Sequence, residues 1–505
     1  MAAFPSASAQ GADQSPTSQN VVVIGAGPAG LTAALELSKS SVPCTVLEAG
    51  TVPGGLAKTD EYKGYRFDIG GHRFFTKVRL VEELWHELLP QDFLECTRLS
   101  RIYYRGRYFK YPLEPWDALR GLGLGNAVAC LGSYLYARLF PVRPELSFDA
   151  WVSNRFGRRL FKTFFESYTE KVWGIACREI SADWASQRIR GLDAISLIKN
   201  MLFGKPKEKS KVVKTLIASF HYPRLGPGMM WEKCVERIEA LHSRVCYRLR
   251  VDRIVWEPGR VLAVEAGGAR FAGTHFISTM PIQELIHALQ PAPPKEMQAA
   301  ASDFRYRDFL TVALILRKRN VFPDNWIYIH DPSVKVGRIQ NFKNWSAEMV
   351  PDPETTCLGM EYFCFEGDDL WTRSDAAMRA LATEELARLG IASPDLVVDA
   401  TIVREQKAYP IYDENHQRGL KVLRDFLPEL GNLQLVGRNG MHHYNNQDHS
   451  MLTGLLAARN ILGAHYDLWK VNVDAEYHEA GEILTNEELK HLVTSQPLVP
   501  ERVPR

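Results

Sequence analysis

The chain has 505 residues, of which 46% are hydrophobic and 24% are charged. This is the composition of an ordinary globular protein that is too long for one core. The net charge of +2 is nearly neutral and argues against a nucleic acid or a strongly acidic partner. The eight cysteines form no close CxxC pair, so we expect reduced thiols in a cytosolic protein and no metal site.

Residues 21–37 predict a buried strand, a tight turn and a helix in immediate succession. Three glycines have the GxGxxG spacing of a turn that receives a pyrophosphate at a helix N-terminus. A side chain at the second glycine, Gly27, would push the phosphate oxygens away. The predicted cofactor contacts of this turn are Gly25, Gly27, Pro28, Ala29 and Gly30.

Glu48 follows a second predicted strand, residues 44–47. An acidic residue at this distance from the glycine turn accepts hydrogen bonds from the ribose hydroxyls of a bound adenosine. The turn and Glu48 together therefore predict a dinucleotide site.

Residues 121–140 contain a single charged residue, Arg138, and approach the length of a membrane span. Our interpretation is a buried helix of a second domain. The alternative is a surface that meets lipid or a lipid-linked substrate, which would give the protein a peripheral membrane contact.

The remaining elements predict helices first and a mixed sheet later. A hairpin is expected over residues 101–112, where alternating aromatic and basic side chains face either a polar ligand or an exposed sheet edge. The expected helices are 78–89, 116–124, 127–140, 148–155 and 160–170. The expected strands are 248–256, 261–265, 275–279, 309–317, 326–330, 337–342 and 356–365.

This order predicts an α/β fold in which a Rossmann-type dinucleotide-binding domain is interleaved with a helical domain and a mixed β-sheet substrate domain. We expect a disordered N-terminal tail over residues 1–19 and a C-terminal tail over residues 471–505. The dinucleotide-binding domain is expected in three parts, residues 20–112, 205–290 and 411–470. The helical insertion is expected over residues 113–204 and the substrate domain over residues 291–410.

Two further segments identify the cofactor by resemblance. Gly54-Gly55-Leu56 follows soon after Glu48, and Asp68-Ile69-Gly70-Gly71-His72 is followed closely by Phe74. These segments resemble the FAD-binding part of the amine oxidase and UDP-galactopyranose mutase superfamily, which also includes protoporphyrinogen oxidase, and they are most similar to the mutases. The resemblance implies FAD as the cofactor. The residues that it places at FAD are Gly55, Leu56, Gly71 and His72.

A second cofactor signature lies near the C-terminus. Residues 433–436 predict a short strand that ends at Gly437-Arg438, and residues 445–454 open a helix. Asn-Gln-Asp-His-Ser-x-x-x-Gly closely resembles the mutase sequence at the same place, which implies a contact with the flavin end of FAD. The residues concerned are Gly437, Arg438, Asn446, Gln447, Asp448 and Ser450.

The substrate site is also assigned by resemblance. Tyr168-x-x-Lys171-Val172-Trp173 and Trp184-x-x-x-Arg188 are similar to mutase segments, and Arg188 and Arg404 are our candidates for binding phosphate. Either arginine could instead pair with an acidic side chain. His72 is expected beside the flavin, so the candidate catalytic residues are His72, Arg188 and Arg404. The other candidate substrate contacts are Trp173, Asn344, Trp345, Tyr409 and Tyr444.

The chain departs from the mutases at two of these positions. Asn344-Trp345 stands where the mutases carry a phosphate-binding tyrosine, so Tyr444 is left to supply a second hydroxyl. These departures put UDP-galactose itself in doubt and leave a bulky polar substrate.

The resemblance implies a flavoenzyme that acts on a sugar nucleotide or a lipid-linked sugar by pyranose/furanose mutase chemistry at reduced flavin. The alternative is an oxidoreductase like amine oxidase or protoporphyrinogen oxidase, a dehydrogenase or desaturase in which hydride passes from substrate to flavin. A third reading is a non-catalytic flavin-binding protein. Cations that converge at the flavin favour the first, and an apolar tunnel favours the second. The expected partners are a phosphate-bearing sugar and a reductant or electron acceptor.

Overall fold

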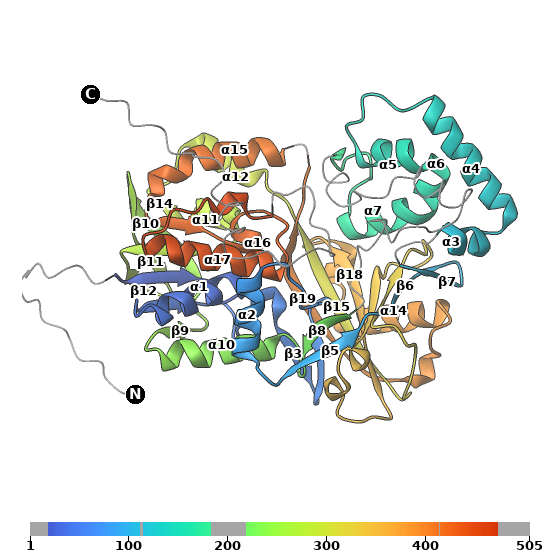
Figure 1. Cartoon of the computed structure of the whole chain (residues 1–505), viewed down its shortest axis with the longest axis horizontal. Helices are drawn as coiled ribbons and strands as arrows, with labels where there is room; N and C mark the ends of the chain where they lie inside the picture. Colours follow the sequence, from blue (N-terminus) through green and yellow to red (C-terminus); the bar gives the residue numbers. More distant parts are fainter. Residues whose placement is uncertain (1–18, 112–114, 183–218, 414, 473–505) are drawn as a thin grey trace, which may run out of the picture.

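A computed structural model describes residues 19–111, 115–182, 219–413 and 415–472 of the chain. Three parts follow one another across the molecule: a parallel α/β part, a central seven-stranded sheet and a helical part at the far end (Figure 1). The predicted α/β class is confirmed, and so is its interleaving, because the parallel sheet draws its strands from both ends and the middle of the chain.

The α/β part is built on a five-stranded parallel sheet in the order β20-β13-β1-β2-β9. Its central strand has the sequence Val-Val-Val-Ile and is buried at every position, as a strand covered on both faces must be. The strands are β1 (Val21–Ile24), β2 (Cys44–Leu47), β9 (Arg244–Cys246), β13 (His275–Ser278) and β20 (Leu433–Leu435).

Two helices far apart in sequence meet closely beside this sheet. They are α1 (Pro28–Lys39) and α17 (Gln447–Ile461), both drawn beside the sheet in Figure 1. A Cβ placed on Gly454 of α17 would lie 2.0 Å from the carbonyl oxygen of Ala29 in α1. Only glycine permits this approach, which brings the C-terminal helix against the helix of the glycine turn.

The central sheet is mixed, in the order β19-β15-β18-β17-β16-β6-β7. All neighbouring strands pair antiparallel except β6 and β16, which are parallel. Strand β7 forms one edge of the sheet, so the hairpin predicted at 101–112 ends as an exposed sheet edge. The strands are β6 (Ser100–Tyr104), β7 (Arg107–Lys110), β15 (Tyr306–Leu316), β16 (Trp326–Ile329), β17 (Arg338–Asn341), β18 (Thr356–Cys364) and β19 (Val397–Pro410).

The two faces of this sheet have different partners. Alternate residues of β15 and β18, such as Leu310 and Met360, form a core with Met378 of α14 (Asp375–Arg388). The residues between them face the other way, where Phe309 and Phe363 cluster with Ile69. The second face therefore looks toward the Gly70-Gly71-His72 segment.

The helical part follows the edge strand β7 and packs on an aromatic core that includes Phe148, Trp151 and Trp173. Its helices are α3 (Pro115–Leu122), α4 (Leu124–Leu139), α5 (Phe148–Phe156), α6 (Arg158–Leu160), the π-helical turn Phe161–Glu166 and α7 (Ser167–Trp173). The interpretation of residues 121–140 as a buried helix is wrong, because most large apolar side chains of α4 are exposed.

Smaller elements make up the rest of the part of the chain that the structure describes. A four-stranded sheet contains β10 (Val251–Glu257), β11 (Arg260–Ala266), β12 (Ala269–Ala272) and β14 (Leu289–Gln290). Two pairs are β3 (Thr59–Tyr62) with β4 (Tyr65–Asp68), and β5 (Phe93–Thr97) with β8 (Ser219–Pro223). The other helices are α2 (Arg79–Leu88), α10 (Gly228–Ala240), α11 (Ile282–Ala288), α12 (Lys295–Ser302), α13 (Asp369–Thr372), α15 (His416–Phe426) and α16 (Gly437–Gly440).

Candidate active site

The glycine turn and Glu48 are joined by hydrogen bonds. The Glu48 carboxylate accepts the N–H of Ala26 at 2.7 Å and the N–H of Gly50 at 2.6 Å. Gly25 has a φ of +96°, and a Cβ on Gly30 would lie 2.0 Å from the Gly25 carbonyl oxygen. The turn therefore requires glycine at both places, and Glu48 stands beside it at the end of β2.

A second glycine segment lies against the turn. A Cβ on Gly55 would lie 3.2 Å from Cα of Gly27, and the N–H of Gly54 donates to the Ala26 carbonyl at 2.8 Å. The next residue, Leu56, packs with the apolar cluster of Phe309. Two stretches of bare backbone thus face each other beside the N-terminus of α1, which is a cradle for a phosphate group.

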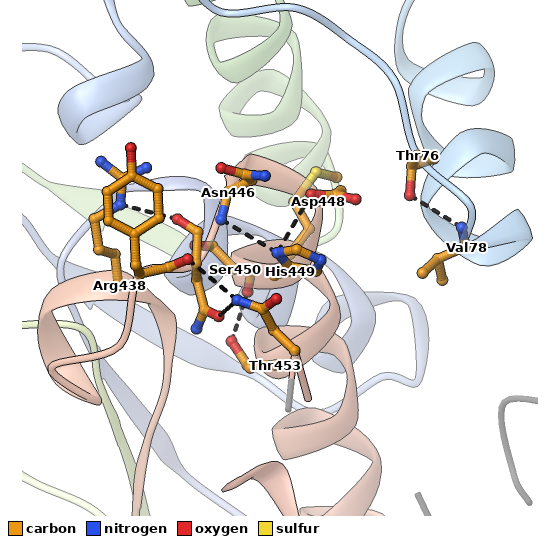
Figure 2. Close-up of polar contacts among 12 residues, drawn as sticks. Thr76, Val78, Arg438, Asn446, Asp448, His449, Ser450 and Thr453 are labelled. Atoms are coloured by element: carbon orange, nitrogen blue, oxygen red, sulfur yellow. Dashed lines mark hydrogen bonds and ion pairs between the residues drawn. The ribbon is translucent and has the colours of Figure 1, made fainter. Parts of the chain in front are cut away.

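The start of α17 forms another part of the site (Figure 2). Asn446 caps this helix, and its N–H donates to Nδ1 of His449 at 3.3 Å. Both polar atoms of the Gln447 side chain are buried without a hydrogen-bond partner among the described residues. Orphaned buried amide groups at a helix start are the donors and acceptors that a dinucleotide would satisfy.

Arg438 is held firmly next to this helix start. Its guanidinium donates to the carbonyls of Asn445 at 2.9 Å and Ala408 at 3.0 Å. It also lies over the rings of Tyr409 and Tyr444, at 5.3 and 4.9 Å from their centroids. Figure 2 shows Asn446, Asp448 and Ser450 at the start of α17, with Arg438 to one side of them.

Three predicted substrate contacts join this cluster. The rings of Tyr409 and Tyr444 are stacked with centroids 5.8 Å apart, and Trp173 lies 6.1 Å from Tyr444. Burial raises the pKa of Tyr409 to about 12. The hydroxyl of Tyr409 therefore stays protonated at neutral pH and can donate a hydrogen bond.

His72 lies near two arginines. Its Nδ1 is buried without a hydrogen-bond partner among the described residues. Burial lowers its pKa from 6.5 to about 3, and the positive charges of Arg438 and Arg338 add to this effect. The imidazole is therefore neutral at physiological pH, with one nitrogen available to a ligand.

The sequence analysis missed the second of these arginines. Arg338 and Glu361 face each other across β17 and β18 and form a buried ion pair, and Nε2 of Gln340 donates to Glu361 at 2.9 Å. Burial raises the pKa of Glu361, and the charge of Arg338 opposes this shift. A partial signal was available at Glu361, because a charged residue there interrupts the apolar sequence of β18.

This buried pair lies directly behind the His72 segment. A Cβ on Gly71 would lie 2.7 Å from Nε2 of Gln340, and one on Gly70 would lie 3.7 Å from Nη2 of Arg338. The Gly70-Gly71 backbone therefore rests on the polar face of the central sheet.

Arg404, a predicted phosphate contact, is not brought to this cluster. It lies opposite Leu310, on the face of the sheet that α14 covers. There it pairs with Asp375 at 2.7 Å and donates to the carbonyls of Arg373 and Trp371. The physical reason is strand alternation, because neighbouring residues of β19 point to opposite faces. Arg188 lies outside the described residues.

The side chains of Asn344 and Trp345 donate hydrogen bonds to main-chain carbonyls. The amide of Asn344 donates to the carbonyls of Phe322 and Asp324, at 2.9 and 2.8 Å, and the indole N–H of Trp345 donates to Asn325 at 3.0 Å. The Trp345 ring lies 3.3 Å from the Cβ position of Gly71. Trp345 therefore supports the His72 segment from behind.

Comparisons with known proteins agree with this geometry. Residues 28–462 match the family model described as flavin containing amine oxidoreductase. The fold is similar to reduced UDP-galactopyranose mutase, with a TM-score of 0.79, 20% identity, and coverage of 92% of this chain and 100% of that one. It is also similar to wild-type putrescine oxidase bound to putrescine, with a TM-score of 0.60, 17% identity, and coverage of 88% and 99%.

The sequence matches to curated proteins are short and cover about a fifth of this chain. The 1-hydroxycarotenoid 3,4-desaturase of Flavobacterium sp. (strain P99-3) is 42% identical over 102 residues, which are 19% of this chain and 20% of the desaturase. The chain thus spans about a fifth of the length of such relatives. The family match extends from Pro28, the first residue of α1, to the residue that follows α17. The chain therefore belongs to the flavin-containing amine oxidoreductase family and is a flavoenzyme whose cofactor is FAD.

Proposed function

We propose that this enzyme acts on a sugar that carries a diphosphate, either a sugar nucleotide or a lipid-linked sugar, by redox-neutral chemistry of the mutase kind. The observation that carries the proposal is the position of two guanidinium groups beside His72: the Cβ position of Gly70 lies 3.7 Å from Nη2 of Arg338 and 4.0 Å from Cε1 of His72, and the charge of Arg438 also acts on the pKa of His72. Cations at this position suit an anionic substrate. An apolar hydride donor would instead favour an apolar wall.

The residues present fit the cofactor. Room for the pyrophosphate would be left by Gly25, Gly27, Gly30 and Gly55. The Glu48 carboxylate would accept hydrogen bonds from the ribose hydroxyls. Gln447 and Arg438 would lie at the flavin end, where the buried amide of Gln447 lacks a partner among the described residues. When bound and reduced, FAD supplies an electron-rich centre for exchange at the anomeric carbon of the sugar without net redox change.

The chain's own groups would bind and orient the substrate. The bond from Arg338 to Glu361 uses Nε, which fixes the guanidinium, and its Nη2 end lies toward Gly70. Tyr409 keeps its proton and donates a hydrogen bond to a phosphate oxygen. Trp173 and Tyr444 form an aromatic wall for the ring portion of the substrate. His72 stays neutral, so it orients a ligand by hydrogen bonding and contributes no charge.

The test is anaerobic turnover by the holoenzyme. The purified yellow protein is reduced with dithionite and given a panel of nucleotide sugars, while the flavin spectrum and the products are followed. We expect furanose products from the reduced protein without net flavin oxidation. If reduced protein is inert and a substrate bleaches the oxidised flavin, the enzyme is a dehydrogenase or desaturase, and the proposal is wrong.

A further inference from the structure

Helix α4 has an apolar outer side. Of the fifteen large hydrophobic side chains that are exposed in the described part of the chain, eight lie between residues 128 and 146. Their exposed fractions range from 51% to 74%. The spacing of the first, second, third and fifth of them is that of one helix face. Six belong to α4 or cap its C-terminus: Val128, Leu131, Leu135, Tyr136, Leu139 and Phe140.

This stripe cannot turn inward, because the opposite side of α4 is already packed. Cys130 and Ala137 are each only 9% exposed, and a Cβ on Gly157 would lie 2.6 Å from the backbone nitrogen of Tyr134. Figure 1 shows α4 along the outer edge of the helical part, away from the five-stranded sheet. The apolar stripe is therefore a fixed surface.

The surroundings of the stripe are positively charged. Residues 115–162 contain seven lysines and arginines and three acidic residues. All three acids are engaged: Asp117 accepts the N–H of Lys110, Glu145 pairs with Arg155, and Asp149 accepts the N–H of Ala150. Six cations of this region are exposed: Arg120, Arg138, Arg143, Arg158, Arg159 and Lys162.

We propose that the outer face of α4 binds the surface of an anionic lipid bilayer, with the helix lying in the plane of the membrane. An apolar stripe with aromatic side chains and basic neighbours is suited to the boundary between headgroups and acyl chains. In the described part of the chain, no helix is long and apolar enough to cross a bilayer. A second copy of the chain is a poorer occupant, because a symmetric contact through this face would bring the same arginines together.

The test is vesicle flotation of the full-length holoenzyme. We expect the protein to float with vesicles that contain about 40% phosphatidylglycerol and to stay behind with pure phosphatidylcholine. Leu135→Glu with Leu139→Glu should lower the bound fraction about tenfold or more, because two exposed apolar contacts are lost. Arg138→Glu with Arg143→Glu should do the same, and about 0.5 M NaCl should weaken binding by the wild type.

Matched controls separate the stripe from general surface changes. Val398→Glu with Leu241→Glu replaces two exposed apolar residues elsewhere, and Lys295→Glu with Lys421→Glu removes two exposed cations elsewhere. Both should float like the wild type, and all variants should keep their flavin.

Three results would overturn the proposal. The first is that the wild type fails to float with anionic vesicles. The second is that the stripe variants float as well as the controls do. In the third result, gel filtration shows a dimer that Leu135→Glu with Leu139→Glu dissociates, without any binding to vesicles. A second copy would then cover the stripe.

Discussion

At Gly27 the distance between two backbones decides whether a pyrophosphate fits. The Cβ position of Gly27 lies 3.9 Å from Cα of Gly55, so the branches of a larger side chain would fill the space between the two segments. We expect Gly27→Val to be purified without flavin, as judged by its absorbance spectrum. Gly132→Val is the matched control, because a Cβ there meets no atom within 4 Å. Stoichiometric flavin in Gly27→Val would refute the placement of the cofactor.

Arg338 and Arg404 both make ion pairs, but only Arg338 is close to His72. Removing Arg338 leaves Glu361 buried without its charge partner, so Arg338→Met should lose about 3–5 kcal/mol of unfolding free energy. Arg338→Met with Glu361→Met should recover most of that stability in urea unfolding. It should still bind a nucleoside diphosphate more weakly than the wild type in calorimetric titration.

Arg404→Ala is the contrasting variant. Because Asp375 is mostly exposed, the loss of this pair should cost no more than about 1 kcal/mol. The affinity for the nucleoside diphosphate should not change. The opposite result would be a weaker affinity for the nucleoside diphosphate in Arg404→Ala and a normal affinity in Arg338→Met with Glu361→Met. It would show that Arg404, and not Arg338, binds the diphosphate.

His72 makes the folded protein less stable in acid. The unfolded chain takes up a proton near pH 6.5, but the folded chain takes it up only near pH 3, so the unfolding free energy falls as the pH is lowered through this window. We expect His72→Gln to lose less stability than the wild type between about pH 7 and about pH 5 in urea unfolding. His465→Gln, which removes an exposed histidine, should behave like the wild type. An equal loss in all three proteins would contradict the shift.

These residues show what the sequence could and could not reveal. The glycine turn is contiguous in sequence, so its spacing alone predicts its geometry. The pair of Arg338 and Glu361 depends on the register of β17 against β18, which no local pattern contains. The structure places Arg404 opposite Leu310, on the face away from His72, and a motif does not show which face of a strand its residues occupy.

At the scale of the element, the contact between α1 and α17 fixes the relative position of the two helix N-termini at the cofactor site. Gly454 lets the two helices touch, and their N-termini carry the glycine turn and the Gln447 segment. Gly454→Ala would force the helices apart and should lower the unfolding free energy by about 1–3 kcal/mol. Flavin should also dissociate more readily from this variant, measured by fluorescence. Gly132→Ala in α4 should change neither quantity.

The elements themselves were largely predictable. The predicted apolar strands are present in the structure, because a strand that is buried on both faces needs a continuous apolar sequence. The predicted helix of residues 445–460 is also present, because a helix packed on one side needs apolar residues at helical spacing. The orientation of α4 was not predictable, since a helix with a single charged residue, Arg138, has no polar face to mark the solvent side. Its packing against Gly157 and the burial of Cys130 and Ala137 show which side faces inward.

At the scale of the whole molecule, one lysine fastens the helical part to the central sheet. The ammonium of Lys171 donates to the carbonyls of Ile329, Asp331 and Val336, at 3.1, 2.5 and 3.4 Å. Since Trp173 lies on the same helix, Lys171→Met should weaken nucleoside diphosphate binding about tenfold while the flavin content stays normal. Lys295→Met, at an exposed position, should change neither. Loss of flavin in Lys171→Met would show that the lysine supports the whole fold.

The strand order of the parallel sheet has a consequence for biosynthesis. The first strand, β1, lies between β2 and β13, and β13 pairs with β20, which begins at Leu433. The cradle is complete only after α17, which ends at Ile461, has left the ribosome. In a nascent chain one edge of the apolar strand β1 therefore stays unpaired until β13 is made, and one edge of β13 stays unpaired until β20 is made, which makes chaperone protection important. FAD can stabilise only chains that have been made this far, so a supply of cofactor during translation gives no benefit to shorter products.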